Sequence, residues 1–240
     1  MNAVTARRGK PNPHSLRAPV SITAGGRTGI ADAEEAIPEK LVAGTLKPYT
    51  AKGCRYLQHA CYLAGGPELA AVGRFGIPTS AYIQDTGHFN AAEFIIAYNQ
   101  LFYCLLAEAV RRGDIAPLLG WTAADLRTRQ LPDVLIQRND SEFLAPIDAR
   151  QFTGVIRVTG MRLVHRRHRY VQMDTAVEVW GGDGSPGPQA PQGGAAPAEG
   201  EAPESDARGR ARGNVTIAVL LREDDSESAP PTTHRPKGAR

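Results

Sequence analysis

One stretch, from Ser80 to Gly113, constrains the fold more than any other part of this chain of 240 residues. Placed at helical intervals, Ala91 to Val110 leaves almost no polar face, which is typical of a helix that other elements enclose. Its length would suit a membrane span, but the glutamates and amides inside the window argue against one. Asn90 with Glu93 three residues later predicts a capped start, and Arg111-Arg112-Gly113 predicts a cationic, glycine-terminated end. We therefore expect the central helix of a soluble domain.

Composition and missing motifs exclude several functional classes. A formal net charge of +3 is only mildly basic and gives no reason to expect a nucleic-acid partner. The three cysteines show no metal-ligand spacing and predict reduced thiols in the cytoplasm. No apolar run follows the basic N-terminal residues, so we expect neither a signal peptide nor secretion. The sequence has no GxSxG, Walker, GxGxxG or HExxH motif, and we expect no metal and no cofactor.

The remaining elements are predicted from periodicity. Residues 32–44 have apolar residues near helical spacing, with Pro38 as an early break, and residues 55–63 and 70–77 are expected to form a β-hairpin. Behind the central helix, Thr122 to Asp125 opens a short helix with a capping signature. Four further strands are predicted at residues 134–138, 152–162, 170–180 and 214–221.

These elements predict an α+β hot-dog domain, in which a curved antiparallel sheet wraps a long central helix. We expect the domain to cover residues 30–221, with a flexible insertion at residues 181–213 in the turn of a hairpin. Residues 1–29 and 222–240 are predicted to be disordered tails. The alternative, a helix lying on an open sheet, requires a polar helix face that the sequence lacks.

The first candidate site lies where the central helix begins. Gly87, His88 and Asn90 precede or open the helix, where free backbone N–H groups and the helix dipole favour an oxyanion or a polarised thioester carbonyl. The imidazole of His88 can accept and donate a proton, so this residue is a candidate general base. The simpler alternative is that Asn90 only caps the helix and His88 packs against a carbonyl.

Other polar residues fall where the core should be dry. Asn99 is a poor helix former in the middle of the helix, and the alternative to a site role is a structural amide bonded to a strand or to a dimer partner. Tyr49 and Tyr82, in segments interpreted as extended, can donate to a developing enolate while packing on an acyl chain, although strand tyrosines are more often packing residues. The basic run from Arg162 to Arg169 is interpreted as a solvated hairpin tip, with docking of an acidic carrier protein or of a cofactor phosphate as the alternative.

At these residues the chain resembles the FcoT-type fatty acyl-thioesterase family. The shared motifs are LKPYTAKGCRYL from Leu46, SAYI from Ser80, TGHFNA from Thr86 and YNQL from Tyr98. The likeness extends more weakly over residues 33–221, and the insertion at residues 181–213 departs from it. The resemblance implies the hot-dog fold and places Tyr49, Tyr82 and Asn99 at the family's site residues, with His88 and Asn90 in its GHFN segment.

The resemblance also implies acyl-thioester chemistry of two kinds. One is hydrolysis of long-chain acyl-CoA. The other is addition of glycine to the β-carbon of an α,β-unsaturated acyl-carrier protein, with release of a 3-[(carboxymethyl)amino] fatty acid in isonitrile lipopeptide biosynthesis. We expect the second, with the first as the alternative. A non-enzymatic rival is an acyl-chain-binding module with an inert polar core.

The resulting hypothesis has an enoyl thioester on a carrier protein enter a tunnel beside the helix, with its carbonyl at the amides of Gly87 to Asn90. We expect His88 to deprotonate glycine, Tyr82 and Asn99 to position the thioester, and Tyr49 to line the entry. Lys52 or Arg55 is expected to pair with the glycine carboxylate. A homo-oligomer is expected by analogy with other hot-dog sheets.

Overall fold

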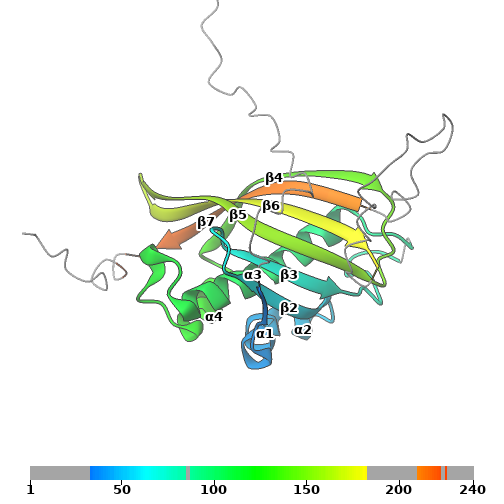
Figure 1. Ribbon diagram of the computed structural model, residues 1–240, viewed down its shortest axis with the longest axis horizontal. Coiled ribbons are helices and arrows are strands. Elements are labelled where there is room, and N and C mark those ends of the chain that lie inside the picture. Colours follow the sequence, from blue (N-terminus) through cyan, green and yellow to red (C-terminus); the bar gives the residue numbers. More distant parts are fainter. Residues whose placement is uncertain (1–32, 85–86, 183–209, 223–224, 226–240) are drawn as a thin grey trace, which may run out of the picture.

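Seven antiparallel strands and one long helix make up most of the structure, a computed structural model that describes residues 33–84, 87–182, 210–222 and 225 (Figure 1). In chain order the elements are β1 (Ala33–Ala36), α1 (Glu39–Thr45), α2 (Lys47–Ala51), β2 (Leu57–Ala64), β3 (Ala70–Phe75), α3 (Ala91–Arg112), the 3-10 turn η1 (Ala116–Leu118), α4 (Ala123–Arg129), β4 (Val134–Ala145), β5 (Phe152–His165), β6 (Arg169–Gly181) and β7 (Arg210–Leu221).

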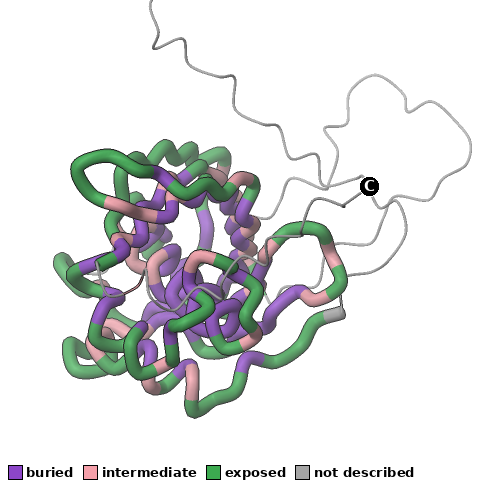
Figure 2. The backbone as a smooth tube through the Cα atoms, turned by 90° about the vertical axis from the view of Figure 1, so that its left-hand side faces the viewer, coloured by how far each residue is buried: buried purple, intermediate pink, exposed green. Residues whose placement is uncertain are grey.

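The strands form one sheet in the order β1-β2-β3-β5-β6-β7-β4, and each neighbouring pair is antiparallel. The sheet is curved, and α3 runs along its inner face with α1, α2 and α4 on the same side (Figure 1). Buried residues gather between this helical layer and the sheet (Figure 2). This arrangement is the hot-dog architecture, so the predicted α+β fold class is confirmed.

Helix α3 begins and ends close to the predicted residues. The Asn90 side-chain oxygen accepts hydrogen bonds from the amides of Ala92 and Glu93, at 3.0 and 3.2 Å, and Gly113 ends the helix in the left-handed conformation at φ 76°. Only half of the expected capping box forms, because the Glu93 side chain does not bond back to the Asn90 amide. Every residue from Gln100 to Val110 is buried.

The enclosure of α3 differs from the prediction in one respect. The sheet covers one side of the helix, while α1 and α4 pack against another. In the first half of α3 a stripe stays partly exposed, formed by Ala92, Ile95, Ile96 and Asn99. These residues share one face because they are three or four positions apart. The sheet therefore does not wrap the helix on every side.

Two strand glycines allow α3 to lie close to the sheet. A Cβ atom added at Gly73 would lie 2.7 Å from Leu57 Cδ1 and 3.0 Å from Leu101 Cδ1. One added at Gly213 would lie 2.7 Å from the Asp140 carbonyl oxygen and 3.0 Å from the Phe94 ring. At Gly213 the obstacle is a backbone oxygen, so this position requires the absence of a side chain, whereas at Gly73 the ends of the leucine side chains would have to move.

Two element predictions need correction. Residues 33–36 form strand β1, which pairs with β2, and the helix predicted for residues 32–44 begins only at Glu39, after Pro38. Strand β4 extends to Ala145, well beyond the predicted end at residue 138. Most of this extension is exposed, so side-chain alternation could not reveal it; its backbone is held by pairing with β7.

The predicted insertion and tails fall largely outside the described residues. The predicted insertion at residues 181–213 is too long, because β6 ends at Gly181 and residues 210–213 belong to β7, which pairs with β6 as far as Arg210 opposite Trp180. Residues 1–32 are not described, and beyond Leu221 the structure describes only Arg222 and Asp225. The division into a domain and two disordered tails stays a prediction. No helix in the described ranges is long and apolar enough to span a bilayer.

Candidate active site

The loop between β3 and α3 carries Tyr82, Gly87, His88 and Asn90, and backbone bonds hold both of its ends. The Ile77 amide donates to the Ala149 carbonyl and the Phe89 amide to the Ile147 carbonyl, each at 2.9 Å. Between these points the Ala81 amide donates to the Tyr56 hydroxyl oxygen at 2.9 Å. The segment after β4 and the tyrosine before β2 therefore position the loop against the first turn of α3.

An aromatic cluster fixes the entry to the helix. Phe89 is 3% exposed, and its ring centroid lies 4.6 Å from that of Phe152, 6.2 Å from that of Phe94 and 6.3 Å from that of Phe143. Such tilted pairs contribute beyond simple burial. Because Phe89 is anchored between α3 and the sheet, the adjoining His88 and Asn90 are held at the helix N-terminus.

At the predicted oxyanion site, Gly87 to Asn90, fewer backbone amides are available to an oxyanion than expected. The amide of Phe89 already donates to Ile147, and those of Ala92 and Glu93 are taken by the Asn90 side chain. Among the described residues, the amides of Asn90 and Ala91 have no protein acceptor and are the ones that can meet an oxyanion. Gly87 has a φ of 76°, which a residue with a side chain rarely adopts, and both it and His88 are exposed.

Tyr49 packs near the middle of α3, beside the turn that follows Asn99. Tyr49 lies in α2 and not in an extended segment, which corrects the prediction. Its ring centroid is 6.4 Å from that of Tyr103, one helical turn beyond Asn99. Burial raises the pKa of Tyr49 and the nearby Tyr103 adds to the shift, so its phenol stays protonated and able to donate. Asn99 is half-buried, and its side chain has no hydrogen-bond partner in the described part of the chain.

The remaining predicted residues lie at the edges of this region. Tyr82 is 56% exposed in a run of bends, so it too is outside any strand. Lys52 is exposed at the end of α2. Arg55 is half-buried and donates from Nε to the Leu57 carbonyl at 3.3 Å. The structure thus gathers Tyr49 with the Asn99 turn, and Gly87, His88 and Asn90 with the helix start.

Sequence reasoning assigned no role to Gln100, the amide beside Asn99. Its side chain is fully buried, and Oε1 accepts from the amides of Tyr56 and Leu57, both at 2.9 Å. Nε2 donates to the Cys54 carbonyl at 2.8 Å. Gln100 therefore fixes the segment before β2 onto α3, and that segment supplies the tyrosine that holds the site loop. Gln100 lies seven residues, or about two helical turns, beyond Glu93 and therefore on the same helix face. This spacing was the sequence signal that could have identified it.

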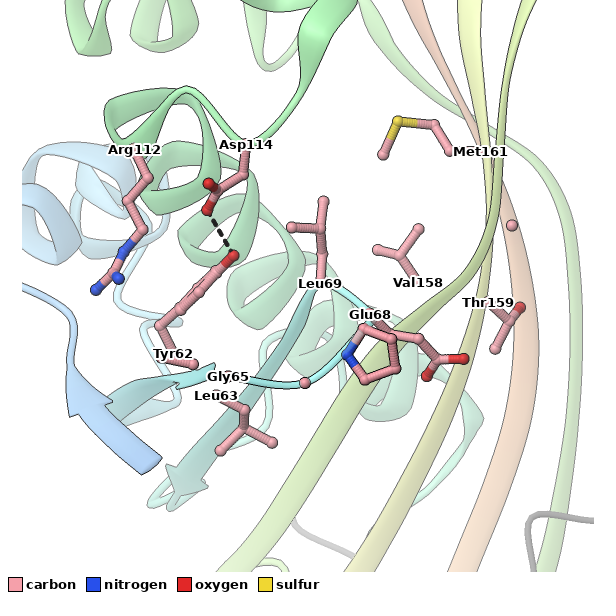
Figure 3. Close-up of a pocket in the computed structure, with 14 residues that line it drawn as sticks. Tyr62, Leu63, Gly65, Glu68, Leu69, Arg112, Asp114, Val158, Thr159 and Met161 are labelled. Atoms are coloured by element: carbon pink, nitrogen blue, oxygen red, sulfur yellow. Dashed lines mark hydrogen bonds between the residues drawn. The ribbon is translucent and has the colours of Figure 1, made fainter. Parts of the chain in front are cut away.

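A pocket of about 620 Å³ lies at the other end of α3, beside the β2–β3 turn (Figure 3). There the Tyr62 hydroxyl donates to Asp114 Oδ2 at 2.7 Å, and the Arg112 guanidinium lies 4.5 Å from the Tyr62 ring centre. Arg112 is already paired with Glu35 and Glu108. None of the eight predicted site residues lines this pocket, so it is not the tunnel that the sequence hypothesis requires.

The basic run lies far from the helix start. It covers the end of β5, the turn that follows and the first residue of β6, and β5 is 14 residues long from Phe152 to His165. At the rise of an antiparallel strand, this separates the turn from Phe152 by about 45 Å. Phe152 packs on Phe89, so the turn lies at the opposite end of the sheet from the predicted site.

In the described ranges, no group of three or more His, Cys, Asp or Glu side chains is arranged to hold a metal ion. Cys54, Cys61 and Cys104 are all free thiols. What the helix start offers is backbone donors, a neighbouring imidazole and buried polar side chains, a set suited to stabilising a negatively charged oxygen.

Comparison with known proteins gives a consistent result. Residues 44–189, which include all eight predicted site residues, match the model of the FcoT-like thioesterase domain. A (2E)-enoyl-[ACP] glycyltransferase of Mycobacterium marinum is 42% identical over 149 residues, covering 62% of this chain and 81% of that protein. A protein of the same name from Streptomyces coeruleorubidus is 38% identical over 150 residues, covering 60% and 88%. A solved mutant thioesterase of Pseudomonas aeruginosa aligns with 76% of this chain and 94% of its own, at 12% identity and a TM-score of 0.37.

Proposed function

The chain belongs to the FcoT-like thioesterase family, and from that premise we propose that it adds glycine to an α,β-unsaturated acyl-[acyl-carrier protein]. The observation that carries the proposal is the 42% identity to a (2E)-enoyl-[ACP] glycyltransferase, because the matching family domain spans every predicted site residue. The product would be a 3-[(carboxymethyl)amino] fatty acid, made in the cytoplasm for isonitrile lipopeptide biosynthesis.

In the addition step the glycine nitrogen forms a bond to the β-carbon while the π electrons of the double bond move toward the thioester oxygen. The Asn90 and Ala91 amides lie at a helix N-terminus and would stabilise that charge. His88 would accept the proton that the ammonium loses, and the α-carbon then takes a proton. Water attack on the thioester carbonyl breaks the C–S bond and frees the carrier thiol.

Other predicted residues would hold the substrates. Asn99 and Tyr82 would position the thioester, and the protonated phenol of Tyr49 would line the acyl entry. The partly exposed apolar stripe of α3 that includes Ile95 and Ile96 supports an acyl-chain surface leading to Asn99. For the glycine carboxylate, the candidate expected from the sequence is Lys52 or Arg55.

The test is incubation with a crotonyl carrier protein, with and without glycine, followed by product mass. A product heavier by one glycine supports the proposal, and free unsaturated acid that ignores glycine would instead indicate the alternative, acyl thioester hydrolysis. In His88→Ala and Asn99→Ala we expect turnover to fall about 100-fold or more if each loses a transition-state contact. Wild-type turnover in both variants contradicts the assigned roles.

The non-enzymatic rival, an inert acyl-binding module, would gain support if Asn99 bonded only to backbone. Its side chain makes no such bond to the described residues, which argues for an amide kept for a substrate.

We also propose a homo-oligomer. Strand β4 lies at a sheet edge and exposes Leu135, Ile136 and Phe143, which supports pairing between copies. Light scattering of the purified chain tests it, and a monomer across the assay range rejects it.

A further inference from the structure

Three polar atoms are buried around the start of α3 without a hydrogen-bond partner. They are Oγ of Ser80, Nδ2 of Asn90 and Oε2 of Glu93. Glu93 as a whole is only 3% exposed. A buried carboxylate oxygen that makes no hydrogen bond is costly, so native structures rarely keep one unless a ligand or a bound water completes it.

Two of these residues, Ser80 and Glu93, are linked to Tyr56. The Tyr56 hydroxyl accepts from the amide of Ala81, which follows Ser80 directly. Burial raises the pKa of Tyr56, and the nearby charge of Glu93 raises it further. Gln100, seven residues beyond Glu93 and therefore on the same helix face, accepts from the Tyr56 amide. Ser80 and Glu93 thus lie in the neighbourhood of Tyr56, one on the loop and one on the helix.

Asn90 joins this group through its cap. Its Oδ1 accepts from the amides of Ala92 and Glu93, so the amide plane lies over the first turn, and its other end, Nδ2, is the buried donor without a partner. The capping role expected from the sequence therefore uses only half of this side chain. The unused half and the Glu93 carboxylate belong to one helical turn.

We propose that Glu93, Asn90 and Ser80 bind the zwitterion of the amino-acid substrate, with Glu93 Oε2 accepting from its ammonium group and Asn90 Nδ2 and Ser80 Oγ donating to its carboxylate. The three atoms comprise one anionic acceptor, one donor and one hydroxyl that can donate, which is the complement of a small amino acid. The inference rests on the proposed function for the identity of that amino acid as glycine.

The buried position also gives a reason for choosing the smallest amino acid. Glycine carries no side chain, so it needs little more space than its ammonium and carboxylate groups occupy. This assignment gives the carboxylate to Asn90 and Ser80 in place of Lys52 and Arg55. Lys52 is exposed, and Arg55 already donates to a backbone carbonyl, so neither is held ready for it.

The test compares Glu93→Gln with Glu108→Gln, the same change at another buried glutamate of α3 whose carboxylate is paired with two arginines. In Glu93→Gln we expect the KM for glycine to rise about 100-fold, the size of one lost buried charge pair, while the KM for the enoyl carrier stays within about twofold. Glu108→Gln should leave both constants unchanged. Asn90→Asp keeps the cap but loses the Nδ2 donor, so it should also raise the KM for glycine.

Thermal stabilisation by ligand gives a readout that needs no turnover. Glycine should raise the melting temperature of the wild type, whereas methylamine and acetate, which each lack one of its charged groups, should raise it much less. Glu93→Gln should abolish the rise. If both the KM for glycine and the thermal shift are unchanged in Glu93→Gln and Asn90→Asp, the three atoms hold only structural water and the inference is overturned.

The inference and the function fail separately. If the wild type makes the glycine adduct and Lys52→Ala, but not Glu93→Gln, raises the KM for glycine, the zwitterion site is rejected while the activity stands. If the wild type makes no adduct but glycine still stabilises it through Glu93, the binding site stands and the proposed activity is rejected.

Discussion

Two neighbouring amides on α3, Asn99 and Gln100, should separate stability from activity. Gln100 is fully buried and satisfies three backbone groups, the amides of Tyr56 and Leu57 and the carbonyl of Cys54. Replacing it by alanine leaves all three buried without a partner. Each such group costs about 1–3 kcal/mol, so Gln100→Ala should lose about 3–9 kcal/mol of the unfolding free energy. Small domains have only about 5–15 kcal/mol in total, so this loss is large.

Asn99→Ala is the matched control, because it removes an amide of the same helix that has no hydrogen-bond partner among the described residues. Its stability should change by less than about 1 kcal/mol, since alanine is also the better helix former. Its turnover of the enoyl carrier should nevertheless fall about 100-fold, as expected for a group that contacts the thioester. Gln100→Ala should instead keep measurable turnover per folded molecule at low temperature.

Urea unfolding followed by circular dichroism gives the free energies, and product mass gives turnover under conditions where each variant is folded. Gln100→Glu offers a further check: it keeps an acceptor for the two amides but turns an oxygen toward the Cys54 carbonyl, so its stability should fall between those of wild type and Gln100→Ala. The reasoning is refuted if Gln100→Ala unfolds within about 1 kcal/mol of wild type. Equal destabilisation by Asn99→Ala refutes it as well.

Three further predictions concern stability. Burial opposes the charge of Glu108, but hydrogen bonds from two arginines hold its pKa below the usual value of 4.5. The stability that this carboxylate contributes is therefore present above about pH 4.5 and is lost as the pH falls through the pKa of the folded state. Urea titrations should show the difference in unfolding free energy between wild type and Glu108→Gln shrinking as the pH falls. Arg129 is 6% exposed and pairs with Asp133 and Asp225, so Arg129→Ala should cost about 3–5 kcal/mol in chemical denaturation, and a cost near zero would show that the pair is not formed. Gly213→Ala forces a methyl group to within 2.7 Å of a carbonyl oxygen and should lower stability by about 1–3 kcal/mol in calorimetry, whereas an unchanged melting temperature would mean that β7 and β4 shift freely.

The fold was predictable wherever burial imposed a period on the sequence. Helix α3 shows its cap at Asn90, its glycine end at Gly113 and apolar residues nearly all round, and the structure confirms all three features. Strand β6 alternates cleanly and was located within one residue at each end. The second half of β4 was missed because exposed side chains at a sheet edge carry no alternation, and its order comes from backbone pairing with β7.

The candidate site was only partly predictable. Motif content and the physics of a helix N-terminus pointed to Gly87, His88 and Asn90, because those arguments need only local sequence. The contributions of Tyr56 and Glu93 depend on contacts between segments far apart in the chain, such as the bond from the Ala81 amide to the Tyr56 hydroxyl. No local pattern distinguishes a surface glutamate of a capping box from one buried without a partner.

The pairing of β6 with β7 has a practical consequence. Trp180 and Arg210 face each other across one rung of the ladder, although residues 181–209 intervene along the chain. A foreign polypeptide inserted between these two strands would therefore begin and end at nearly the same point of the sheet. A fluorescent reporter or an affinity handle inserted there would extend from the sheet without altering the pairing of β6 with β7.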